Sequence, residues 1–92
     1  MIIKVNEYIQ TGLTEDDVNK LTSIFDTHIL NTEDKDVIID FNKVKYFTTS
    51  FVEPFLFKLH NTNCKLINLS NYGKKIMQDI IDYRHYQSII IE

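Results

Sequence analysis

The stretch VIIDFNKVKYFTTSFVEPFLFKLHN, residues 37–61, decides the fold because it contains the pattern of a buried strand followed by the pattern of an amphipathic helix. It begins with VIIDF, a short apolar run rich in β-branched side chains, which is typical of a strand covered on both faces of a parallel sheet. NKVKYFTT follows as an ordered loop or a short extended piece. In the remainder, SFVEPFLFKLHN, apolar side chains recur at helical spacing, and the stripe expected to be buried consists of Phe51, Phe55, Leu56 and Leu59. The stretch therefore predicts a strand followed by an amphipathic helix.

The start of this helix is expected at Ser50. Serine is a favoured N-cap residue, and Glu53 stands three residues later, at the spacing of a capping box. Pro54 then falls in the first turn, where a missing backbone N–H is tolerated. Because a cap contributes about 1 kcal/mol, Ser50→Ala is expected to lower stability by that amount.

Strands and helices alternate along the rest of the chain. Further strands are predicted from MIIKV toward Ile9, in CKLINL and in YQSIIIE. Helices are predicted in LTEDDVNKLTSIFDTHIL, capped by Thr14 and ended by the polar run NTEDKD, and in NYGKKIMQDIIDY, capped by Ser70. The order β-α-β-α-β-α-β predicts one small α/β domain over residues 1–92, with a four-stranded, mostly parallel or mixed sheet and three helices.

Composition and charge restrict the classes of function. The 92 residues are 43% hydrophobic, which fits one folded domain, and the net charge of −3 gives no support for a nucleic-acid binder. No run of about 18 apolar residues would cross a bilayer, and the N-terminal stretch lacks the features of a secretory signal. The single cysteine, Cys64, excludes an internal disulfide and fits a reducing cytoplasm, where the protein is expected to reside.

The sequence contains no motif for catalysis, metal binding or a cofactor. It has neither GxGxxG nor GxxxxGK[ST], and its three histidines are scattered. Asp79, Asp82 and His85 are spaced by three residues, but the pattern favours an outward-facing helix surface over a metal site. Asp40 ends a strand, as the phospho-accepting aspartate of receiver domains does, but no lysine directly follows the next strand. We therefore expect no catalytic residue, no metal, no cofactor and no enzymatic activity.

The candidate site is the hydroxyl trio Thr48, Thr49 and Ser50. It follows a strand of the expected parallel sheet, and ligand or partner sites in such sheets lie at the carboxyl ends of the strands. Helix capping explains Ser50 alone and assigns no role to Thr48 and Thr49. Two interpretations remain open at this point, a helix cap only or a functional surface.

The segment DFNKVKYFTTSFVEPFLFKL, Asp40–Leu59, resembles the core segment of the STAS-like family, which is known from anti-anti-sigma factors and from the cytoplasmic tails of sulfate transporters. KLINLS, Lys65–Ser70, is similar to the next strand and cap of that family. In anti-anti-sigma factors the turn before the helix reads Asp-Ser-Ser-Gly, and a partner kinase phosphorylates the first serine. The corresponding positions here hold Thr48, Thr49, Ser50 and Phe51, so the acid and the glycine are replaced.

The resemblance implies a non-enzymatic regulatory module that docks a protein partner through the Phe41–Ser50 loop and the helix from Ser50, with phosphorylation of Thr49 as a switch. The implied partner class is a histidine-kinase-type ATPase. The alternative is a small phage-type inhibitor that binds and blocks a host enzyme. The residues expected at the docking surface and switch are Thr48, Thr49, Ser50, Phe51 and Glu53, with Asp40, Lys43, Lys45 and Tyr46 as secondary contacts.

The C-terminal run SIIIE is apolar on both faces of the expected strand. An exposed apolar edge strand is an aggregation hazard, so either a helix covers this strand or a partner strand pairs with it. The second case predicts a homodimer through the C-terminal strand.

Overall fold

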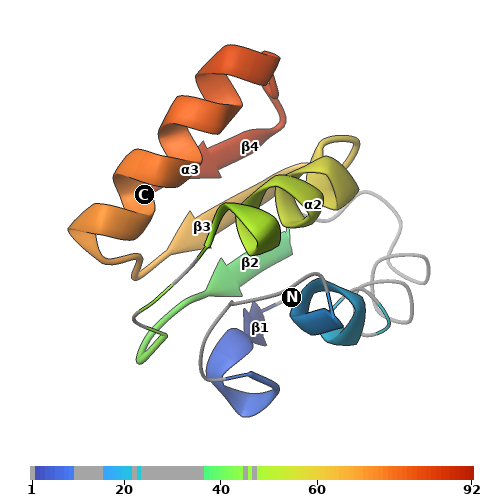
Figure 1. Ribbon diagram of the computed structural model, residues 1–92, viewed down its shortest axis with the longest axis vertical. Helices are drawn as coiled ribbons and strands as arrows, with labels where there is room; N and C mark the ends of the chain where they lie inside the picture. The colour runs from blue at the N-terminus through green and yellow to red at the C-terminus, as the bar shows by residue number, and fades with distance from the viewer. Residues whose placement is uncertain (1, 10–15, 22, 24–36, 45, 47) are drawn as a thin grey trace.

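The computed structural model describes residues 2–9, 16–21, 23, 37–44, 46 and 48–92. Its elements, labelled in Figure 1, are β1 (Ile2–Lys4), the 3-10 helix η1 (Val5–Glu7), β2 (Val37–Asp40), α2 (Thr49–Leu59), β3 (Cys64–Ile67), α3 (Asn71–Arg84) and β4 (Ile89–Ile91). Residues 16–21 and 23 are helical as well. The predicted α/β fold, with a four-stranded sheet and three helices, is confirmed.

The four strands follow one another in the order β1-β2-β3-β4, and every neighbouring pair is parallel. Right-handed crossovers between consecutive neighbours bring each connecting helix to the same face of the sheet. Figure 1 shows α2 and α3 on one side of the strands, and the burial pattern agrees with this arrangement. In β2 and β3 buried residues alternate with half-buried ones.

The prediction that VIIDF is covered on both faces holds fully for one face and in part for the other. Val37 and Ile39 are buried under the helices, while Ile38 between them is only half-buried. An apolar run is compatible with either arrangement, because the sequence of one strand does not show on which side its crossover helices pack.

The core lies between the sheet and the helices that the structure describes. Val18 and Leu21 from the first helix join the same buried cluster as the inward residues of the strands. The centre of the core is aromatic: the Phe51 and Phe55 rings stack with centroids 5.3 Å apart, and the Phe41 ring meets Phe55 edge-on at 5.6 Å. The predicted apolar stripe of α2 is confirmed, since Phe51, Phe55, Leu56 and Leu59 are all buried.

Helix α2 begins earlier than predicted. Thr48, not Ser50, is the N-cap; its backbone is extended, and its carbonyl accepts hydrogen bonds from the N–H groups of Phe51 and Val52 at 3.0 and 2.9 Å. The proposed capping box is therefore wrong, because Ser50 already lies inside the helix. Pro54 is also inside the helix rather than in its first turn.

The first strand is shorter than predicted and does not continue toward Ile9. Lys4 pairs with Asp40, the last residue of β2, so the chain beyond Lys4 has no strand partner on that side. It turns instead into η1, where the N–H groups of Tyr8 and Ile9 both donate to the Val5 carbonyl at 3.0 Å. The predicted cap at Thr14 and the polar run of residues 31–36 lie outside the described residues.

The predicted cap at Ser70 is confirmed. Comparing it with Ser50 tests the assignment of Thr48, rather than Ser50, as the N-cap of α2. The Ser70 Oγ accepts a hydrogen bond from the Gly73 N–H at 3.0 Å, whereas Ser50 has no capping role. We expect Ser70→Ala to lower the free energy of unfolding by about 1 kcal/mol. We expect Ser50→Ala to change it much less, and urea denaturation measures both. Equal losses for the two variants would contradict the assignment of Thr48 as the N-cap.

Candidate functional site

The carboxyl ends of β2 and β3 are tied together by the side chain of Asp40. Its Oδ1 accepts a hydrogen bond from the backbone N–H of Asn42 and another from Asn68 Nδ2, each at 2.9 Å. Asn68 directly follows β3 and adopts a left-handed backbone with φ 60°, which asparagine tolerates well. Asp40 therefore fixes the relative position of two loops at the end of the sheet where partner sites are expected.

The loop after β2 is anchored by two buried apolar residues and presents its polar residues outward. Phe41 and Val44 are buried, and the Val44 N–H donates to the Phe41 carbonyl at 3.0 Å. The turn between them places Lys43 in a left-handed conformation, φ 69°, with its side chain exposed. Tyr46 follows and is 64% exposed. Lys45, which was also predicted to contribute, lies outside the described residues.

The hydroxyl trio divides into one structural residue and two exposed ones. Thr48 is half-buried at the N-cap position, although its side chain makes no capping hydrogen bond. Thr49 and Ser50 are exposed on the first turn of α2. The structure thus places Asp40, Lys43, Tyr46, Thr49 and Ser50 at the same end of the sheet, and we call these five residues the carboxyl-end surface.

Two other residues predicted at the docking surface have structural contacts of their own. Phe51 is fully buried and packs on Phe55, so its side chain belongs to the core and is not exposed to a partner. Glu53 is exposed, and one of its carboxylate oxygens lies 3.9 Å from the guanidinium of Arg84 on α3. An ion pair this exposed contributes little to stability, but it links the outer surfaces of the two helices.

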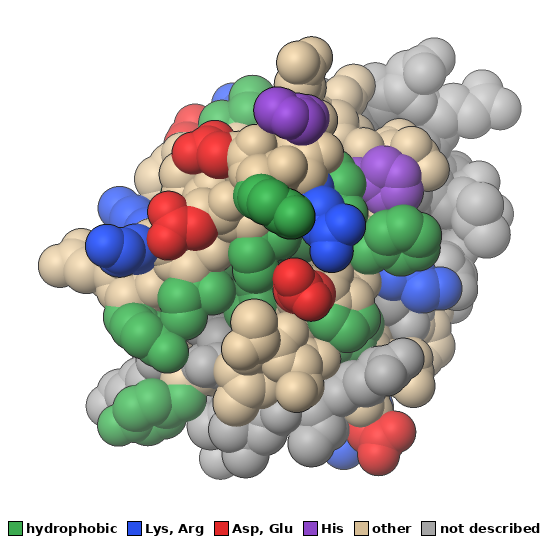
Figure 2. Space-filling model, turned by 45° about the horizontal axis from the view of Figure 1, so that its top comes forward, with side chains coloured by type: hydrophobic (Ala, Val, Ile, Leu, Met, Phe, Trp, Pro, Cys, Tyr) green, Lys and Arg blue, Asp and Glu red, His purple; other side chains and the backbone are tan. Residues whose placement is uncertain are grey.

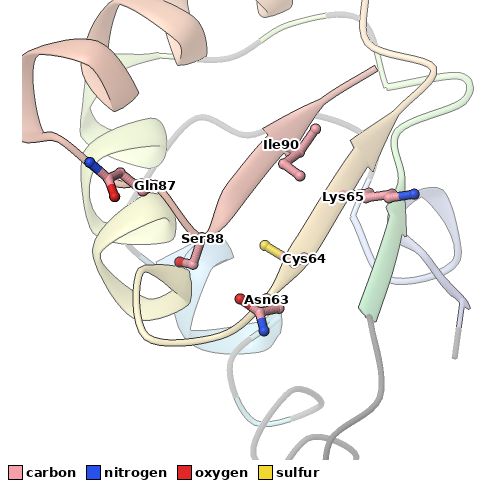
Figure 3. Close-up of a pocket in the computed structure, with 6 residues that line it drawn as sticks. All are labelled: Asn63, Cys64, Lys65, Gln87, Ser88 and Ile90. Carbon is pink, nitrogen blue, oxygen red and sulfur yellow. The ribbon is translucent and has the colours of Figure 1, made fainter.

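A hollow at the opposite end of the sheet is lined by Asn63, Cys64, Lys65, Gln87, Ser88 and Ile90. Figure 3 shows these residues around the starts of β3 and β4. Cys64 is the only thiol of the chain, and burial raises its pKa to about 12. The thiol is therefore protonated near neutral pH and is a poor nucleophile. Ser88 Oγ donates to the His60 carbonyl at 2.5 Å, which holds the chain between α3 and β4 against the end of α2.

The residues proposed and set aside as metal ligands lie at the end of α3. Asp79 is exposed, the Asp82 carboxylate accepts a hydrogen bond from Gln78 Nε2 at 2.9 Å, and His85 is the left-handed C-cap of the helix. In the part of the chain that the structure describes, no group of three or more His, Cys, Asp or Glu residues is arranged to hold a metal ion. Nor does any helix there have the length and apolar character needed to cross a membrane.

An aromatic stack on the helix side of the molecule was missed by the sequence analysis. The His60 ring lies between Phe57 and Tyr86, with centroid distances of 5.0 and 5.1 Å, and Phe57 is 61% exposed. The three-residue spacing of Phe57 and the C-cap residue His60 was a visible signal, but Tyr86 joins them only through the turn after α3. Among the residues drawn in colour, Figure 2 shows acidic, basic and hydrophobic side chains interspersed on this side, with no patch of one charge sign.

Comparison of the chain with protein-family models, with curated proteins and with solved structures gives no match. The resemblance of Asp40–Leu59 to the STAS-like family therefore stays a hypothesis that rests on those residues.

Proposed function

We propose that this protein is a non-enzymatic regulatory module of the cytoplasm that binds a protein partner through the carboxyl-end surface. The observation that carries the proposal is the exposure of Thr49 and Ser50 on the first turn of a helix that is capped by another residue. Tyr46, 64% exposed, supplies aromatic contact area beside them, and aromatic residues are enriched at protein interfaces.

Thr49 is the proposed switch. It is the first residue of α2, and the earliest helical hydrogen bonds come from the N–H groups of Phe51 and Val52. The N–H groups before them have no partner within the helix, and with the helix dipole they favour an anion. A phosphate on Thr49 would add a charge of about −1.5 to −2 at pH 7 without opposing the fold.

The same charge would oppose a docked partner. An interface that covers Tyr46 and the first turn of α2 would have to remove water from the phosphate, which is costly unless the partner supplies a cation. The partner class follows from the STAS-like resemblance: a histidine-kinase-type ATPase that phosphorylates Thr49 and thereby releases itself.

The test compares Thr49→Glu with Ser23→Glu, which adds the same charge at an exposed hydroxyl of the first helix, where Ser23 Oγ donates to the Asn19 carbonyl. Parent and variants serve as baits in native-host lysate, bound proteins are quantified by mass spectrometry, and each candidate is purified for titration. We expect one partner that binds Thr49→Glu about tenfold more weakly than it binds the parent, a loss of about 1.4 kcal/mol. Ser23→Glu should bind as the parent does, and thermal stability should be nearly unchanged for Thr49→Glu.

Two results would contradict the regulatory role of Thr49. One is that Thr49→Glu binds every partner as tightly as the parent does, and the other is that Thr49→Glu unfolds the domain. A captured host enzyme whose turnover falls on binding, without any effect of Thr49→Glu, would instead favour an inhibitor.

A further inference from the structure

One face of the sheet carries no helix among the residues that the structure describes. The strands present two rows of side chains there, set by the parallel register. The first row runs across all four strands as Ile2, Ile38, Lys65 and Ile90. The second row contains Lys4, Asp40 and Ile67 and is extended by Glu92, whose N–H continues the ladder by donating to the Leu66 carbonyl at 3.0 Å. We call these eight residues the helix-free face.

The helix-free face exposes apolar area at both of its edges. Ile2 on β1 is 60% exposed and Ile90 on β4 is 52% exposed, while Ile38 and Ile67 between them are half-buried. Figure 3 shows Ile90 and Lys65 on their neighbouring strands. Fully parallel sheets occur almost only with both faces covered, so an open face of this kind calls for a covering layer.

The charges on the helix-free face indicate what kind of surface could cover it. It carries two cations, Lys4 and Lys65, and two anions, Asp40 and Glu92, so it is neutral although the whole chain has a net charge of −3. Lys65 Nζ lies 3.6 Å from the Glu92 carboxylate within the same chain. A neutral face with both signs at fixed positions is suited to pairing with itself.

We propose that a second copy of this chain covers the helix-free face, related by a two-fold axis that runs parallel to the strands between β2 and β3. Such an axis places β1 opposite β4 of the second copy, and β2 opposite β3. Ile2 then faces Ile90 of the second copy, and Lys4 faces its Glu92. Asp40 comes within reach of Lys65 of the second copy, which lies one row away on the facing strand.

Other two-fold arrangements satisfy these groups less well. An axis across the strands sets the first row against the second, so that an isoleucine faces a charged residue on every strand. The axis parallel to the strands does this only between β2 and β3, where Ile38 faces Lys65 and Asp40 faces Ile67. The parallel arrangement also keeps the strand directions of the two sheets aligned, as in sheets that pack face to face at about 10 Å.

The test is the oligomeric state of the full chain in sedimentation equilibrium over a wide range of concentration. We expect a monomer–dimer equilibrium, with Ile2→Glu and Ile90→Glu each raising the dissociation constant by about tenfold or more because each leaves a carboxylate in an apolar contact. Phe57→Glu is the matched control, since Phe57 is equally exposed but lies on α2, and it should leave the dissociation constant unchanged. Circular dichroism of each variant checks that it is folded.

A second pair of variants tests the charges, and both variants change the net charge of the chain by the same amount. Lys4→Glu should weaken the dimer, whereas Lys74→Glu, an exposed position on α3, should not. A monomer at every concentration would overturn the proposal, as would equal effects of Ile90→Glu and Phe57→Glu. Weakening by Ile90→Glu without any effect of Ile2→Glu would also overturn it, in favour of pairing through the edge of β4. None of these outcomes depends on the carboxyl-end surface or its partner.

Discussion

Replacing Phe55 with alanine is expected to remove about 3–5 kcal/mol from the free energy of unfolding. Phe55 is fully buried, its ring stacks on Phe51 at 5.3 Å, and it receives the edge of Phe41 at 5.6 Å. Truncation would leave a cavity between α2 and the sheet. The free energy of unfolding of an ordinary domain is about 5–15 kcal/mol, so this loss would be a large fraction of the stability of a chain of 92 residues.

Phe57→Ala is the matched control for that prediction. It makes the same substitution on the same helix, but Phe57 is 61% exposed and contacts mainly the His60 ring. We expect a loss below about 1 kcal/mol, the size of one exposed aromatic contact. Urea denaturation followed by circular dichroism measures both variants, and comparable losses would mean that the aromatic centre of the core is placed wrongly.

Replacing Asp40 with alanine is expected to cost about 1–2 kcal/mol, because two hydrogen bonds to a carboxylate are lost in a half-exposed setting. The same Oδ1 joins Asn42 of one loop to Asn68 of the next, so the loss should loosen the carboxyl-end surface as well as the fold. Hydrogen exchange of the Asn42 amide should therefore accelerate more than exchange in α3.

Two controls separate the hydrogen bonds from the charge. Asp40→Asn keeps an oxygen acceptor at the Oδ1 position and should lose less than Asp40→Ala. Asp79→Ala removes the same charge from an exposed position on α3 and should be nearly neutral. Unfolding should be measured at several protein concentrations, since Asp40 also belongs to the helix-free face. If Asp79→Ala costs as much as Asp40→Ala, the link between the two loops does not stabilise the protein.

The two surfaces of this protein have different physical characters. The carboxyl-end surface is small and rich in hydroxyl groups, and its proposed partner would be controlled by a charge added to Thr49. The helix-free face is an alternation of isoleucines with fixed charges of both signs. Since Asp40 lies on both, a partner at one surface and a second copy at the other would be neighbours.

The sequence by itself determined the elements whose signals are local. VIIDF predicted β2 because β-branched residues adjoin one another, and the spacing of Phe51, Phe55, Leu56 and Leu59 predicted the buried side of α2. The cap at Ser70 was predictable because Ser70 Oγ reaches only to Gly73, three residues away.

Only the tertiary structure decided where the elements end and which faces they cover. The first strand stops at Lys4 because β2, its neighbour across a long connection, stops at Asp40. Helix α2 begins at Thr49 rather than after Ser50 because the buried residues Phe41 and Val44 fix the loop that leads into it. The strand order places the helices on one face and leaves Ile38 half-buried. The hydrogen bond between Asp40 and Asn68 joins residues 28 positions apart in the chain. These features depend on contacts between segments distant in the chain, and the pattern of side chains within a single segment carries no information about such contacts.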